Sequence, residues 1–169
     1  MTRNVRSTSK NRWLMIPIIA VVAVIDQLVK EYMLHHLQGG QVHYLIGDWF
    51  RFRLLFNSGA AFSFGEGATW IFTTIQLVFV FAVLLFGHRV NDRWSAIGLA
   101  LMAGGALGNV IDRLFRAPGF FVGHVVDFIS VGNFAVFNLA DSAITCGVVV
   151  FVIGMFIQDR RAKAGEPHA

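Results

Sequence analysis

The pattern of hydrophobic and polar positions is dominated by four long apolar runs, at roughly residues 13–33, 68–87, 94–115 and 134–157. A helix needs ~20 mostly apolar residues to cross the hydrocarbon core of a bilayer, and each run is long enough. The pattern therefore predicts an all-α membrane protein with four transmembrane helices. Little sequence lies outside the runs, so we expect one integral membrane domain over residues 1–169 with no appended soluble domain.

The segment 38–67 has a different pattern. Apolar residues such as Tyr44 and Phe52 alternate there with polar residues such as His43 and Arg53, and glycines supply turn positions. Alternation with a period of two is typical of a half-buried strand. We therefore expect two short strands in a small antiparallel β-sheet outside the bilayer. Residues 57–67, with the sequence NSGAAFSFGEG, are expected to form a loop whose backbone approaches a ligand.

Composition and charge support a membrane protein. The chain is 56% hydrophobic and only 14% charged, which excludes an ordinary soluble domain. Nine of the 14 Lys and Arg residues lie in the arm 1–12, in the link between the second and third runs, and in the tail 158–169. Basic residues favour the cytoplasmic side, so both termini are expected in the cytoplasm, and 38–67 and 116–133 outside it. The net charge of +4 then reflects topology, and we predict no nucleic-acid partner.

Two further features of the apolar runs affect the interpretation. The basic arm and first run could form a cleaved signal peptide, but no small-residue cleavage site follows, so we expect a retained helix. The single cysteine, Cys146, lies in the fourth run without a neighbouring base or cation, so we expect it to be a packing residue.

The candidate chemistry centres on two acidic residues, Asp127 and Asp141. Both lie in the stretch His124–Asp141, where most of their neighbours are apolar. Charge near a bilayer is costly unless it faces protein or water, so such residues mark a functional site. Two carboxylates brought together by folding could share a proton and activate a water molecule. Asp141 lies in the first turns of the fourth helix on the same face as Asn138, and a helix N-terminus favours its ionised form.

Other polar residues in the runs must also find partners. Asp26 and Lys30 are spaced i, i+4 and can form an ion pair that either braces the site or touches substrate. In the third run, small residues at four-residue intervals permit close helix packing. A neighbouring face of this helix carries Gly105, Asn109 and Asp112, with Arg113 beside them. The polar residues of this group either hold loops or position the two aspartates.

Three classes of membrane protein fit these residues: a hydrolase, a small proton-coupled transporter and a non-catalytic assembly subunit. A transporter should show internal repeats, and none is convincing. An assembly subunit would not need its polar groups on one side of the membrane. We expect no metal, because His124 and Asp127 lack a third ligand, and no serine nucleophile, because no GxSxG motif is present.

Several short blocks, in order along the chain, resemble lipoprotein signal peptidase (signal peptidase II), a bacterial inner-membrane aspartic protease family. They are Asp26-Gln27-x-x-Lys30, Asn57-Ser58-Gly59-Ala60-Ala61-Phe62-Ser63, Gly104-Gly105-Ala106-Leu107-Gly108-Asn109-x-x-Asp112-Arg113, Val126-Asp127-Phe128-Ile129 and Phe137-Asn138-x-Ala140-Asp141. Each block alone is weak, but together they extend over most of the chain and are highly specific.

The resemblance implies a four-helix fold with a small extracytoplasmic sheet, both termini cytoplasmic, and a site facing the periplasm. It implies cleavage of diacylglyceryl-modified prolipoproteins just before the lipidated cysteine, and inhibition by globomycin. Asp127 and Asp141 would be the catalytic pair, without metal or cofactor. The positions expected to support the site or contact substrate are Asp26, Lys30, Asn57, Gly105, Asn109, Asp112, Arg113 and Asn138. We expect a monomer.

Overall fold

Four long helices and a small sheet form the protein in a computed structural model that describes residues 8–59, 68–90 and 92–164. Helices α1 (Thr8–His36), α2 (Thr69–Phe86), α3 (Arg93–Phe115) and α4 (Leu139–Ala164) are all long and apolar enough to cross a membrane. Strands β1 (Val42–Ile46), β2 (Phe50–Asn57) and β3 (Val125–Val131) form one antiparallel sheet in that order. The four-helix prediction is confirmed.

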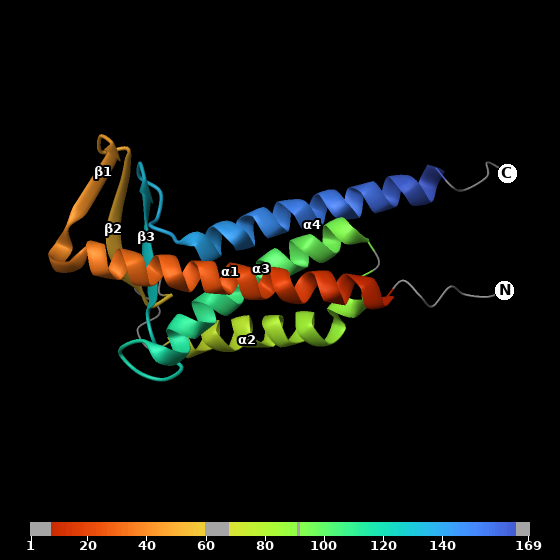
Figure 1. Cartoon of the computed structure of the whole chain (residues 1–169), viewed down its shortest axis with the longest axis horizontal. Helices are drawn as coiled ribbons and strands as arrows, with labels where there is room; N and C mark the ends of the chain where they lie inside the picture. The colour runs from red at the N-terminus through yellow and green to blue at the C-terminus, as the bar shows by residue number, and fades with distance from the viewer. Residues whose placement is uncertain (1–7, 60–67, 91, 165–169) are drawn as a thin grey trace.

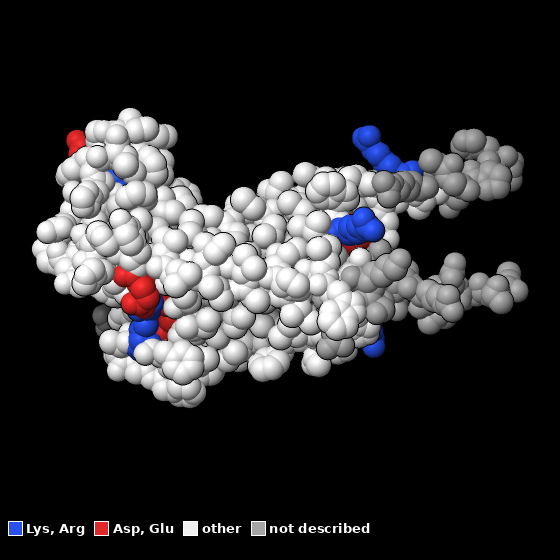
Figure 2. Space-filling view, viewed as in Figure 1, with Lys and Arg blue, Asp and Glu red and all other residues white. Residues whose placement is uncertain are grey.

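Helix α3 is the centre of the bundle and packs against each of the other three long helices. Figure 1 shows the sheet at one end of the bundle, with the start of α1 and the end of α4 at the other. Charged side chains gather near these two ends on the face shown in Figure 2, separated by a wide uncharged zone. Such a zone is what a lipid-facing surface requires. Which end faces the cytoplasm stays a prediction.

Small residues let the helices approach closely. A Cβ atom at Gly104 would lie 2.8 Å from Val22 Cβ on α1, and one at Gly98 would lie 2.5 Å from the backbone nitrogen of Phe151 on α4. At Gly105 it would overlap the carbonyl oxygen of Ala140. The small residues of α3 therefore serve contacts within this chain on two faces.

The structure corrects three sequence-based boundaries. Only two strands were expected, both within 38–67, but Val125–Val131 pairs with β2 as a third strand. The fourth helix was expected from about Phe134, but it begins at Leu139, because Phe137 bridges to Ile129 and polar side chains satisfy the first turn. It also continues through Ala164 into the expected tail. Most of the predicted loop 57–67 lies outside the described residues, as do 1–7 of the basic arm and 165–169 of the tail.

The close contact between α3 and α4 gives a stability prediction. Gly98→Ala should destabilise the protein by about 1–3 kcal/mol, because the added methyl group must displace the α4 backbone. Thermal unfolding in detergent measures the effect. Gly119→Ala is the control, since a Cβ there meets nothing within 4 Å. Equal unfolding temperatures for the two variants would contradict this packing.

Candidate active site

Asp127 lies on β3 with its side chain completely buried. One carboxylate oxygen accepts a hydrogen bond from Asn57 Nδ2 at 2.9 Å, and the other accepts one from Asn138 Nδ2 at 2.6 Å. Asn57 is the last residue of β2, which pairs with β3, so the sheet itself brings this amide to the carboxylate. Asp127 is thus held from both sides by neutral donors.

Asp141 lies in the first turn of α4, where backbone N–H groups have no partner within the helix. Its Oδ2 accepts a hydrogen bond from the backbone nitrogen of Asn138 at 3.2 Å, and its own backbone nitrogen donates to Asn138 Oδ1 at 2.9 Å. This reciprocal pair has the geometry of a helix capping box. Its Oδ1 accepts a bond from Asn109 Nδ2 on α3 at 2.9 Å.

One buried side chain, Asn138, therefore contacts both aspartates. Its amide nitrogen donates to Asp127 and, at 3.1 Å, to Asn109 Oδ1. Its amide oxygen and backbone nitrogen bind Asp141. The sequence prediction that Asp127 and Asp141 belong to one site is consistent with this geometry, because a single residue links them.

Beneath the aspartates lies a buried ion cluster. Lys30 Nζ contacts Asp26 Oδ2 at 2.7 Å and Asp112 Oδ2 at 2.8 Å, and none of these side chains is more than 1% exposed. The predicted i, i+4 ion pair is confirmed, and Asp112 joins it across the helix interface. Lys30 also donates to Asn109 Oδ1 at 3.0 Å. Because Lys30 and Asn138 both donate to that oxygen, the Asn109 amide nitrogen is left to face Asp141.

The same cluster fixes the backbone on either side of the site. Asp26 Oδ1 accepts from the backbone nitrogen of Ala140, at the start of α4. Asp112 Oδ2 accepts from the backbone nitrogen of Val126, next to Asp127. The two carboxylates thus attach α4 and β3 to helices α1 and α3, and Lys30 balances part of their charge.

Arg113 follows Asp112 on α3, but its side chain contacts a different part of the protein. Its Nη1 donates a long hydrogen bond of 3.4 Å to the carbonyl oxygen of Ser58, and its guanidinium lies 6.0 Å from the Phe72 ring centroid. The adjacent Gly59, at φ +89°, places its N–H 2.7 Å from Asn57 Oδ1. Arg113 therefore contacts Ser58, directly after β2, while Asp112 pairs with both Lys30 and Arg116.

A cavity of about 620 Å³ opens beside Asp141 and Asn57. Its remaining lining comes from the segment before α4 and from the exposed face of that helix: Phe134, Ala135, Val136, Phe137, Ser142, Thr145 and Cys146. Cys146 is exposed, so its prediction as a packing residue is wrong. The cavity has mainly apolar walls and includes the carboxylate residue Asp141 in its lining, which suits an apolar substrate with a reactive polar group.

The electrostatic environment makes Asp127 an unusual acid. Burial raises the pKa of Asp127 to about 6, the hydrogen bonds from Asn57 and Asn138 oppose the increase, and the charge of Asp141 adds to it. A carboxyl group with a pKa near 6 can hold a proton close to neutral pH and can both donate and accept one.

Hydrogen bonds and ion pairs connect all the predicted site residues except Gly105 and Arg113. Gly105 makes room for the α4 backbone, and Arg113 adjoins the loop after β2. Two residues of the site were not predicted from the sequence. They are Arg116, which pairs with Asp112, and Gln27, which donates to Asp112 Oδ1 at 3.1 Å. The i, i+4 spacing of Arg116 from Asp112 was a signal for that pair.

Comparison with known proteins identifies related sequences. The family model described as signal peptidase (SPase) II matches residues 18–157. The chain is 45% identical over 146 residues to lipoprotein signal peptidase of Rhodococcus jostii, covering 86% of this chain and 74% of that protein. It is 42% identical over 159 residues to lipoprotein signal peptidase of Mycobacterium avium, covering 90% and 87% respectively.

A solved bacterial membrane enzyme shares the fold. Its structure superposes with a TM-score of 0.74 at 28% sequence identity, covering 92% of this chain and 94% of that one. A second bacterial membrane enzyme gives a TM-score of 0.72 at 29% identity. The helices and three-stranded sheet described above therefore match an architecture found in membrane enzymes.

The buried ion cluster gives a test by substitution. Lys30→Met should destabilise the protein by about 3–5 kcal/mol, because Asp26 and Asp112 would lose their shared buried cation. Thermal unfolding in detergent is the measurement. Lys163→Met removes an exposed i, i+4 pair with Asp159 and should leave the unfolding temperature nearly unchanged. A Lys30 variant as stable as the Lys163 variant would contradict the cluster's role.

Proposed function

This chain belongs to the signal peptidase II family, and we propose that it is an intramembrane aspartic endopeptidase acting on diacylglyceryl-modified prolipoproteins. The proposed cut removes the signal peptide on the N-terminal side of the lipidated cysteine. The names of the relatives, lipoprotein signal peptidases, support the substrate class. The observation that carries the aspartic mechanism is the single amide side chain of Asn138, which contacts both Asp127 and Asp141.

The proton distribution follows from the two environments. Asp127 is buried on a strand between neutral amides, and its raised pKa of about 6 lets it hold a proton more readily than an ordinary aspartate. Asp141 lies at the N-terminus of α4, where the helix dipole and a backbone N–H favour negative charge. We therefore assign the ionised base to Asp141 and the acid to Asp127.

The chemical steps use only these two groups and water. Ionised Asp141 removes a proton from a water molecule, whose oxygen attacks the carbonyl carbon of the scissile peptide, while Asp127 gives its proton to the carbonyl oxygen. In the second half, the C–N bond breaks and the leaving nitrogen takes the proton held by Asp141. A hydroxyl proton of the tetrahedral intermediate returns to Asp127 as the new carboxylic acid forms. One water is consumed and both aspartates return to their starting state.

The supporting residues keep the pair in place. Asn57 and Asn138 orient Asp127, while Asn109 and Asn138 orient Asp141. The cavity beside Asp141, with mainly apolar walls, is the proposed path for the lipid-modified segment, which reaches it from the bilayer between α4 and the sheet. In this proposal the sheet end faces away from the cytoplasm in a bacterial inner membrane, both termini are cytoplasmic, and the protein acts as a monomer that globomycin inhibits.

Cleavage of a synthetic lipidated prolipoprotein by purified protein in detergent tests the proposal. Asp127→Asn and Asp141→Asn should each abolish cleavage before the lipidated cysteine while leaving the unfolding transition cooperative, because each removes one partner in proton transfer. Asp159→Asn, at an exposed position on α4 far from the pair, is the matched control and should cleave normally. Substantial activity in either site variant would remove that residue from the catalytic pair.

A further inference from the structure

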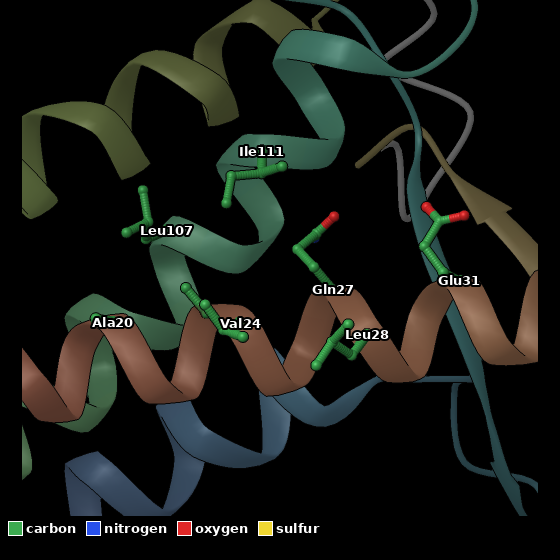
Figure 3. A pocket seen from close by; sticks show the side chains of 8 residues that line it. Ala20, Val24, Gln27, Leu28, Glu31, Leu107 and Ile111 are labelled. Atoms are coloured by element: carbon green, nitrogen blue, oxygen red, sulfur yellow. The ribbon is translucent and has the colours of Figure 1, made fainter.

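A second apolar surface lies outside the proposed active site, in a groove between α1 and α3. Figure 3 shows Gln27 of α1 pointing toward α3, where Leu107 and Ile111 form the other wall, while Val24 and Leu28 complete the lining on α1. The groove has a volume of about 350 Å³, and Gln27 and Glu31 lie at its sheet end. We propose that it binds one phospholipid whose headgroup carries both a phosphate and a primary ammonium group, an inference that does not depend on the proposed peptidase activity.

The length of the groove fits one acyl chain. It extends from Glu31 to Ala20, eleven residues along α1, or ~16 Å at 1.5 Å per residue. One leaflet of a ~30 Å hydrocarbon core is about as deep. Glu31 lies five residues before the end of α1, which places its carboxylate near the boundary where headgroups begin.

The sheet end of the groove carries an ion pair whose two members can bind a phosphate group and an ammonium group. Arg116 Nη2 contacts Glu31 Oε1 at 2.7 Å, and Glu31 is 65% exposed. Figure 2 shows acidic and basic side chains together at the sheet end of α1. Within the described part of the chain, no hydrogen bond engages Arg116 Nη1 or Glu31 Oε2. These atoms can take a phosphate oxygen and an ammonium N–H, respectively.

The local charge balance selects among headgroups. Arg116 belongs to a connected series of charged side chains formed by Asp26, Lys30, Asp112, Arg116 and Glu31. Three carboxylates against two cations leave an excess of negative charge. An anionic lipid would be repelled, whereas a zwitterionic headgroup can place its ammonium on Glu31 and its phosphate on Arg116. A quaternary ammonium group has no N–H to donate, so a choline headgroup fits less well.

The bound headgroup would also contact the network behind the aspartates. Arg116 donates to Asp112, which binds Lys30, and Lys30 donates to Asn109, the partner of Asp141. The proposed lipid site and Asp141 therefore lie at the two ends of one series of ion pairs and hydrogen bonds. The bound lipid would stabilise the surface end of the same buried cluster.

Native mass spectrometry of the purified full chain provides the test. The probe is an equimolar mixture of phosphatidylethanolamine, phosphatidylglycerol and phosphatidylcholine in detergent. The wild type should retain one phosphatidylethanolamine in preference to the other two lipids. Val24→Trp, which fills the groove, should lower this retention several-fold. Val21→Trp, at an equally exposed position of α1 outside the groove, should not. Glu31→Gln should remove the preference for the ethanolamine headgroup.

Three outcomes would overturn the proposal. They are equal retention of phosphatidylethanolamine by the Val24 and Val21 variants, a wild-type preference for phosphatidylglycerol, and a dimer that forms only when Val24 is intact. Thermal unfolding of each variant confirms that it is folded. Because lipid retention is measured without substrate, failure here leaves the peptidase proposal intact, and an inactive peptidase leaves the lipid result intact.

Discussion

The arrangement of the site depends on the side-chain amide of Asn138, which binds two aspartates from different parts of the fold. It donates to Asp127 on β3 and accepts from the backbone of Asp141 on α4. The same residue caps α4, so the start of the helix and the spacing of the aspartates are set by one set of hydrogen bonds. A buried amide that lost any of these partners would leave an unsatisfied polar group, which is costly in a low-dielectric interior. The hydrogen bonds of Asn138 therefore determine both where α4 begins and how the two proposed catalytic aspartates are placed.

The buried ion cluster around Lys30 also helps to hold the two aspartates in place, from beneath the site. A buried ion pair is weak support for stability in itself, because desolvation offsets the attraction. Here the charged groups also bind backbone nitrogens of α4 and β3 through Asp26 and Asp112, and Lys30 orients Asn109. We interpret the cluster mainly as a device for positioning. It attaches the helices to the two elements that carry the aspartates, and it extends to the surface at Arg116.

Local patterns predicted much of this structure, and tertiary contacts determined the rest. The four apolar runs predicted the helices because spanning a bilayer imposes a length, and the i, i+4 spacing of Asp26 and Lys30 predicted their ion pair. Hydropathy could not place the start of α4, because apolar residues continue before Asn138, although the Asn-x-x-Asp spacing resembles a capping box. Strand β3 was missed because it depends on pairing with β2. No local pattern could connect Asp112 to Lys30, which depends on how α1 packs against α3.

The central claim is that Asp141 lies close enough to Asp127 for its negative charge to act on the Asp127 carboxyl group, and isotope-edited infrared spectroscopy of aspartate-labelled protein tests it most directly. The carboxylic acid band of Asp127, identified by its loss in Asp127→Asn, should disappear as the pH rises through about 6 in the wild type. In Asp141→Asn it should disappear at lower pH, because the neighbouring negative charge that raises the pKa of Asp127 is gone. An unchanged midpoint in that variant would show that the two carboxylates do not interact, and would contradict the account.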